Sequence, residues 1–93
     1  IYLERSSNSI FNDVIIEGNY TDFEGGGIFM DESNITLNNV MIVNNNGLGG
    51  GAYLEDTNLI FNNGTIADNI TEWEVGGIYL DNYLDDTYQL YPY

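Results

Sequence analysis

Short runs of alternating apolar and polar residues follow one another along the chain, and each run is typical of a strand with one buried face. In the clearest stretch the apolar positions are Ile28 and Met30, then Ile35 and Leu37, then Val40 and Ile42. These positions predict three short strands, over residues 28–30, 35–37 and 40–42. No helical periodicity is found, so we expect an all-β protein.

This three-strand pattern repeats. A glycine run followed by a short apolar strand occurs at residues 25–31, 49–55 and 76–81, and residues 1–4 match the strand. The steps are 27 residues (Ile1 to Ile28), 24 (Ile28 to Ala52) and 26 (Ala52 to Ile78), a period that marks a repeat architecture. We expect about 3.5 coils of 24–27 residues over residues 1–81, with residues 82–93 as an irregular C-terminal cap or connecting arm.

Aligning the coils places apolar residues on apolar residues at the expected inward positions. The columns are Ile1, Ile28, Ala52, Ile78; Leu3, Met30, Leu54, Leu80; Phe11, Leu37, Phe61; Val14, Val40, Gly64; and Ile16, Ile42, Ile66. Such columns require coils stacked about 4.8 Å apart in parallel sheets along one axis. The predicted fold is therefore a parallel β-helix, a solenoid.

Two asparagine-rich columns fall at the corners between strands. Asp13, Asn39 and Asn63 align between the second and third strands, and we expect them to form an inward structural ladder, because Asn and Asp tolerate the left-handed conformation and can stack. The column of Asn19, Asn45 and Asn69 follows the third strand and is typical of turn chemistry.

The motif Ile-x-x-Asn, followed by Gly-Gly-[Ile/Ala], occurs at residues 16–19, 42–45 and 66–69. It resembles the short repeats of bacterial surface adhesins and autotransporter passengers, including the chlamydial polymorphic membrane proteins, which have Phe in place of Ile. The coils as a whole look like the right-handed parallel β-helices of the pectate-lyase-like superfamily. The resemblance implies a right-handed β-helix, but this superfamily includes lyases, hydrolases, tailspikes and adhesins, so it implies no single activity.

Charge narrows the range of partners. Among the 93 residues, fifteen Asp and Glu face the single Arg5, with no His or Cys, and the net charge is −14. Nucleic acid and anionic membrane surfaces would be repelled, and no apolar run is long enough for membrane insertion. Neutral sugars, cations and partners of complementary charge remain.

Catalysis is not expected. The lyases of the resembled superfamily use a strong base, and Arg5 is the only candidate for it in this sequence. Without Arg5, general acid–base catalysis would have to use carboxylates alone. Neighbouring acids are too abundant to single out a pair, and they suit solvated strand ends equally well. We assign no catalytic residue.

Loops and outward columns supply the binding candidates. Residues 19–24 and 69–74 share one pattern, whereas the middle coil is two residues shorter there, which predicts a notch between loops about 10 Å apart. Candidates for contact with a carbohydrate or a partner are Phe23, Trp73, Asp22, Glu24, Glu72 and Glu74. An outward acidic column is a candidate for weak Ca²⁺ binding: Glu4, Asp31, Glu55 and Asp81. An aromatic ladder is expected beside it: Tyr2, Phe29, Tyr53 and Tyr79.

Four Asn-x-Thr sequences are acceptors for N-glycosylation if the chain passes through a secretory pathway. We expect Asn34 to be the most accessible, Asn19 and Asn69 to share one corner, and Asn63 to be the least accessible.

The sequence therefore favours a secreted or cell-surface structural module. The first coil is expected to expose Ile1 and Leu3, so that it is covered by adjoining coils of a longer β-helix or by identical units stacked head to tail in an extracellular filament or adhesin. The alternative is a carbohydrate-binding or carbohydrate-active β-helix fragment, with glycans as partners.

Overall fold

The computed structural model describes residues 1–71, 76–82 and 87–91, and within these ranges the protein consists of strands and turns without a helix. Among the described strands, only β10 and β11 pair antiparallel, and the other pairs are parallel. The expectation of an all-β protein built on parallel strands is confirmed.

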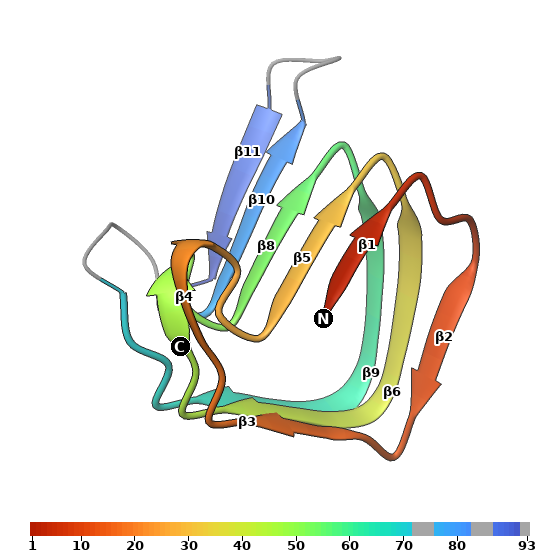
Figure 1. Cartoon of the computed structure of the whole chain (residues 1–93). Helices are drawn as coiled ribbons and strands as arrows, with labels where there is room; N and C mark the ends of the chain where they lie inside the picture. The colour runs from red at the N-terminus through yellow and green to blue at the C-terminus, as the bar shows by residue number, and fades with distance from the viewer. Residues whose placement is uncertain (72–75, 83–86, 92–93) are drawn as a thin grey trace.

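The strands form three sheets, which we call A, B and C (Figure 1). Sheet A has the order β1 (Tyr2–Glu4), β5 (Ile28–Asp31), β8 (Ala52–Glu55), β10 (Ile78–Asn82), β11 (Thr87–Tyr91). Sheet B contains β2 (Ser9–Asn12), β3 (Ile15–Glu17), β6 (Asn34–Val43) and β9 (Asn58–Ala67). Sheet C pairs β4 (Tyr20–Glu24) with β7 (Asn46–Leu48), and Ile70 adds a parallel bridge to Asn46.

The chain passes through sheets A, B and C in turn and then returns to sheet A; we call each such passage a coil. Strand pairing sets one coil directly on the next, since Leu3 pairs with Met30, Met30 with Leu54, and Leu54 with Leu80. In sheet B, Leu37 lies between Phe11 and Phe61. The predicted repeat steps and apolar columns are confirmed.

The core lies inside these columns. Ile28, Met30, Val40 and Ile42 are completely buried, and Leu37 is 1% exposed. Ile1, which was also placed in an inward column, is 48% exposed, because no strand lies over it in the part of the chain that the structure describes.

Two details differ from the predicted three short strands. β6 and β9 each join the expected second and third strands into one bent strand (Figure 1). The first half of β6 pairs with β2, and its second half pairs with β3. The predicted loop of coil one is the strand β4. The bend falls at the left-handed residues Asn39 and Asn63, matched in coil one by Asp13 between β2 and β3.

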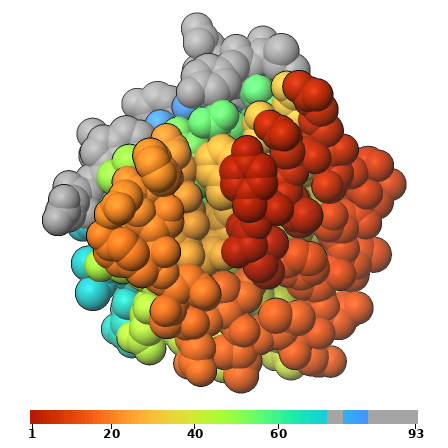
Figure 2. Space-filling view, viewed as in Figure 1, coloured from red at the N-terminus to blue at the C-terminus, as the bar shows by residue number. Residues whose placement is uncertain are grey.

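The two ends of the stack are unlike. Residues 87–91 form β11 rather than an irregular segment, and β11 pairs antiparallel with β10, occupying the edge of sheet A. At the other end, coil one forms the surface that faces the viewer in Figure 2. There β1, β2, β3 and β4 are each paired along one edge only among the described residues.

Candidate functional site

The outer face of sheet A carries the acidic column and the aromatic ladder side by side. Pairing aligns Glu4, Asp31, Glu55 and Asp81 across the four parallel strands. The rings stack with centroid separations of 5.0 Å between Tyr2 and Phe29, 5.7 Å between Phe29 and Tyr53, and 4.8 Å between Tyr53 and Tyr79. Both columns are therefore confirmed, and each ring packs on the next.

Like charges in this column shift the titration of its members. Burial raises the pKa of the half-buried Glu55 carboxyl, and the charges of Asp31, Asp81 and Glu24 raise this pKa further against an opposing hydrogen bond from Tyr53. The carboxylate of Glu4 is the main reason that the pKa of the Tyr2 phenol is raised. The column is thus strained by charge rather than neutralised, since the ion pair of Arg5 is made with Glu32, outside the column, at 3.9 Å.

A metal site is not formed by this column within the residues that the structure describes: they contain no group of three or more carboxylates arranged to hold an ion. The carboxylates are stacked one per coil in a row, whereas Ca²⁺ requires six to eight oxygen ligands around one point. Weak Ca²⁺ binding stays a prediction, which a comparison of thermal stability in excess chelator and in millimolar Ca²⁺ tests.

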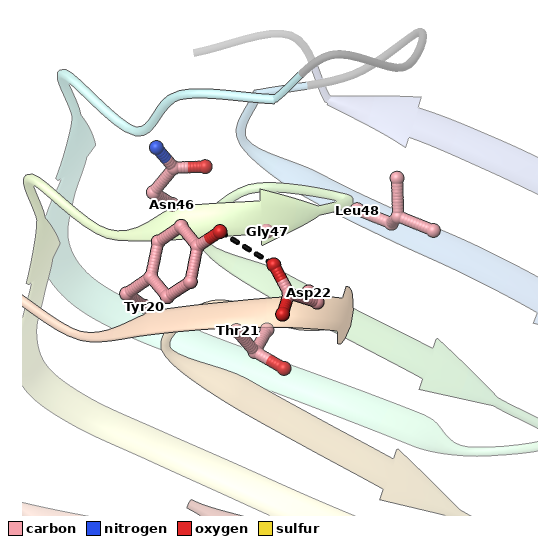
Figure 3. A pocket seen from close by; sticks show the side chains of 6 residues that line it. All are labelled: Tyr20, Thr21, Asp22, Asn46, Gly47 and Leu48. Carbon is pink, nitrogen blue, oxygen red and sulfur yellow. Dashed lines mark hydrogen bonds between the residues drawn. The ribbon is translucent and has the colours of Figure 1, made fainter.

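An open hollow of about 120 Å³ lies between β4 and β7, on the neighbouring coils one and two (Figure 3). The predicted notch between the loops of coils one and three involves residues outside the described ranges, so it stays a prediction. Five residues of β4 oppose three of β7, so that Tyr20 pairs with Asn46 and Glu24 with Leu48 while the residues between them bulge. A bulge of this kind redirects side chains. The lining is Tyr20, Thr21, Asp22, Asn46, Gly47 and Leu48.

The loop candidates are only partly brought together. The Tyr20 hydroxyl donates a hydrogen bond to Asp22, and Phe23 is 72% exposed. Glu24 is close enough to the acidic column to raise the pKa of Glu55. Glu72, Trp73 and Glu74 lie outside the described residues, so the paired second loop stays a prediction.

The asparagine columns exchange the roles expected of them. Asn45 is completely buried, and its Nδ2 donates to Asn69 Oδ1 at 3.0 Å and to the Ile16 carbonyl at 3.0 Å. Its Oδ1 accepts from the Asn19 backbone N–H and Nδ2. This column, expected to be turn chemistry, is the inward ladder.

The column of Asp13, Asn39 and Asn63 was wrongly expected to point inward. All three residues are exposed. Their φ angles of 56°, 54° and 55° confirm the left-handed corner, and Asn39 Nδ2 donates to Asp13 Oδ1 at 2.8 Å on the outside. A left-handed residue at the apex of an outward corner directs its side chain away from the core.

Glycines make room for the inward ladder. A Cβ on Gly27 would lie 3.0 Å from Asn45 Nδ2 and 2.6 Å from the Gly51 carbonyl, and a Cβ on Gly51 would lie 2.9 Å from Asn69 Nδ2. Gly27 and Gly51, which follow the first two Ile-x-x-Asn motifs, are thus steric partners of ladder amides in the next coil. This pairing is the sequence signal that distinguishes the inward column from the outward one.

A second internal ladder, of hydroxyl groups, was not anticipated. Ser33 and Thr57 are buried, the Ser6 N–H donates to Ser33 Oγ at 3.0 Å, and the Ser33 N–H donates to Thr57 Oγ1 at 3.4 Å. Each hydroxyl donates back to the carbonyl two residues earlier, at Asp31 and Glu55. The pattern of acid, any residue, then Ser or Thr at the ends of β1, β5 and β8 could have revealed it.

The predicted order of sequon accessibility is wrong. Asn63 is exposed, whereas Asn34 is half-buried and accepts from Asn58. The Nδ2 atoms of Asn19 and Asn69, to which a glycan would attach, donate to Asn45 and to the Ile42 carbonyl. Glycosylation itself stays a prediction, with Asn63 as an exposed acceptor.

Within the described ranges, no helix has the length and apolar character needed to span a membrane. Comparison with protein-family models, with curated proteins and with solved structures gives no match. Function must therefore be inferred from the surfaces of this chain.

Proposed function

We propose that the chain is a structural module, a right-handed parallel β-helix segment that continues a longer stack by pairing its open strand edges with further coils. The observation that carries the proposal is the register. Coil after coil is joined through sheets A and B and through the Asn45 ladder, so the open face of one coil is a template for another.

The two ends of the stack favour adjoining coils over copies stacked head to tail. The open edges of β1 to β4 match the pattern by which coil one already pairs with coil two. At the opposite end, β11 occupies the edge of sheet A, so a head-to-tail copy would have to displace it. A coil of the same chain type, placed over β1, meets no such obstacle.

A secreted or cell-surface location belongs to the same proposal. The resemblance to adhesin and autotransporter repeats supports it, and so do the acidic surface and the exposed Asn63 sequon. In this setting the module acts as a spacer or adhesin shaft, without catalysis of its own.

An added coil tests the proposal directly. A copy of residues 28–51 is fused before Ile1, and a scrambled 24-residue segment of the same composition serves as the control. We expect the added coil to raise the midpoint of thermal unfolding and to protect the amides of β1 from hydrogen exchange. A fusion no more stable than the scrambled control would contradict the proposal, as would an isolated chain that is already a cooperatively folded monomer with fully protected β1 amides.

The hollow between β4 and β7 supports a second candidate, a carbohydrate-binding function. Asp22 offers carboxylate oxygens to sugar hydroxyls, and the neighbouring Phe23 presents an exposed ring. Screening against an array of glycans tests it. Phe23→Ala and Asp22→Asn should abolish binding while Ile70→Ala, at another exposed apolar position, should not; absence of any glycan binding would remove this candidate.

A further inference from the structure

One half of sheet B presents an outer surface without charge, which we call the neutral face. It is formed by the outward residues of β2 and of the first halves of β6 and β9: Ile10, Asn12, Asn34, Thr36, Asn38, Asn58, Ile60 and Asn62. The alternate residues, such as Leu37, point into the core. In a chain of net charge −14, all four parallel strands of sheet A carry an acid on the outside, whereas this face carries none.

The neutral face is apolar along its middle and rigid at its margins. Ile10 and Ile60 are 59% and 56% exposed, on either side of Thr36. Asn38 donates to Asn12 at 2.8 Å and receives from Asn62 at 2.9 Å, which fixes one row of amides. On the other margin Asn58 donates to Asn34 at 2.9 Å. Side chains already held in this way lose little entropy when a partner binds.

The pattern of this surface is self-complementary. Read along the stack, its middle column is Ile10, Thr36, Ile60, which is unchanged when the order is reversed. Read along β6, its row is Asn34, Thr36, Asn38, which is also unchanged when reversed. A two-fold axis that lies in the contact plane, passes through Thr36 and runs parallel to β6 sets Ile10 of one copy against Ile60 of the other, which gives an isologous contact.

We propose that the neutral face is a lateral contact surface for a second copy of this chain, so that two stacks lie side by side. The charge distribution favours a second copy of the chain as the partner. Two strongly acidic molecules repel each other across sheet A, whereas the neutral face lets them approach without opposing carboxylates. This pairing is perpendicular to the axial continuation described above and does not depend on it.

The contact is small for a single segment. Three strands with four residue steps span about 10 Å by about 13 Å, well below the roughly 800 Å² per partner of a standard interface. Pairing of the isolated chain should therefore be weak and should strengthen with each further coil, because each coil adds one more row of the same pattern.

Sedimentation velocity of the whole chain, produced without glycosylation because a glycan on Asn34 would cover the face, measures the pairing. We expect a monomer–dimer equilibrium at about 1 mM protein in about 1 M NaCl, where the screening length is about 3 Å. Ile60→Glu should abolish the dimer, and Ile70→Glu, a matched change at an isoleucine that is 60% exposed in coil three, should leave it unchanged. Circular dichroism of both variants checks the fold.

A mixture of Ile10→Lys and Ile60→Glu variants should restore pairing that neither shows alone, because a two-fold axis at Thr36 sets these positions against each other. A monomer under all these conditions would overturn the lateral contact. Self-association that survives Ile60→Glu would also overturn it and would instead indicate axial stacking. Binding of a neutral glycan that is lost in Ile60→Glu, without self-association, would reassign the face to that ligand.

Discussion

The outer faces of sheets A and B have the same backbone spacing and the same in-register stacking, yet opposite chemistry. On sheet A every coil repeats an acid, so stacking sets Glu4, Asp31, Glu55 and Asp81 in one row. On sheet B every coil repeats an amide, and stacking sets Asn12, Asn38 and Asn62 in hydrogen-bonded contact. Stacking one carboxylate on another costs about 1 kcal/mol per neighbouring pair in water. Stacking one side-chain amide on another forms a hydrogen bond, because each amide both donates and accepts.

The largest expected effect comes from breaking the shared core beneath sheet B. Leu37→Asp places a charge between Phe11 and Phe61, where it has no partner, and should destabilise the fold by several kcal/mol, enough to unfold it. Thr36→Asp, one residue away on the outside, should cost less than about 1 kcal/mol. Urea unfolding followed by circular dichroism measures both, and a folded Leu37→Asp protein would mean that the register is wrong.

The next effect separates the buried amide ladder from the exposed one. Asn45→Ala leaves the Ile16 carbonyl and the Asn19 amide without their buried partner and should cost about 3 kcal/mol. Asn38→Ala removes amide contacts at the surface and should cost less than about 1 kcal/mol. Equal losses in the two variants would show that burial does not distinguish the ladders.

A smaller effect is the pH dependence of sheet A. Because the pKa of Glu55 is raised in the folded protein, its contribution to stability is present at low pH and is lost as the pH rises through the folded pKa. The midpoint of thermal unfolding should therefore rise as the pH is lowered from 7 toward 5. Glu55→Gln should flatten this dependence. An unchanged slope would show that the raised pKa of Glu55 does not affect the stability of the fold.

The smallest effect exchanges the chemistry of the two faces. Asp31→Asn removes one like charge from the acidic column and should be neutral or slightly stabilising. Asn38→Asp introduces a charge into an amide row and should be slightly destabilising, by less than about 1 kcal/mol. Differential scanning calorimetry at low salt measures whether each change raises or lowers the unfolding temperature. A destabilising Asp31→Asn together with a stabilising Asn38→Asp would contradict the proposed difference between the two faces.

The register of the coils could be predicted because it depends on apolar periodicity. Leu37 aligns with Phe11 and Phe61 at the repeat spacing, and the two partly buried rings pack against the core to which Leu37 belongs. The same spacing placed the acidic and aromatic columns on sheet A.

What could not be predicted was which asparagine column points inward. Asn39 and Asn45 both lie at corners, at the bend of β6 and between β6 and β7. Asn39 is itself the left-handed residue, whereas Asn45 follows the left-handed Asn44. A difference of one position relative to the left-handed residue therefore decides whether the asparagine side chain points to solvent or into the core. The deciding contact, with Gly27 and Gly51, joins neighbouring coils and becomes visible only when they are stacked.

The most direct test of the in-register stack uses a pair of introduced cysteines, because the chain has none of its own. Asn38→Cys with Asn62→Cys places the two cysteines at paired positions, whose Cα atoms are about 4.8 Å apart and within the range for a disulfide. Asn38→Cys with Ile60→Cys shifts one cysteine two residues along the strand, so that the Cα atoms are about 8 Å apart and outside that range. Under mild oxidation at high dilution, mass analysis should show nearly complete intramolecular disulfide in the first pair and little in the second. Equal formation in both pairs, or preference for the shifted pair, would contradict the stack on which both faces depend.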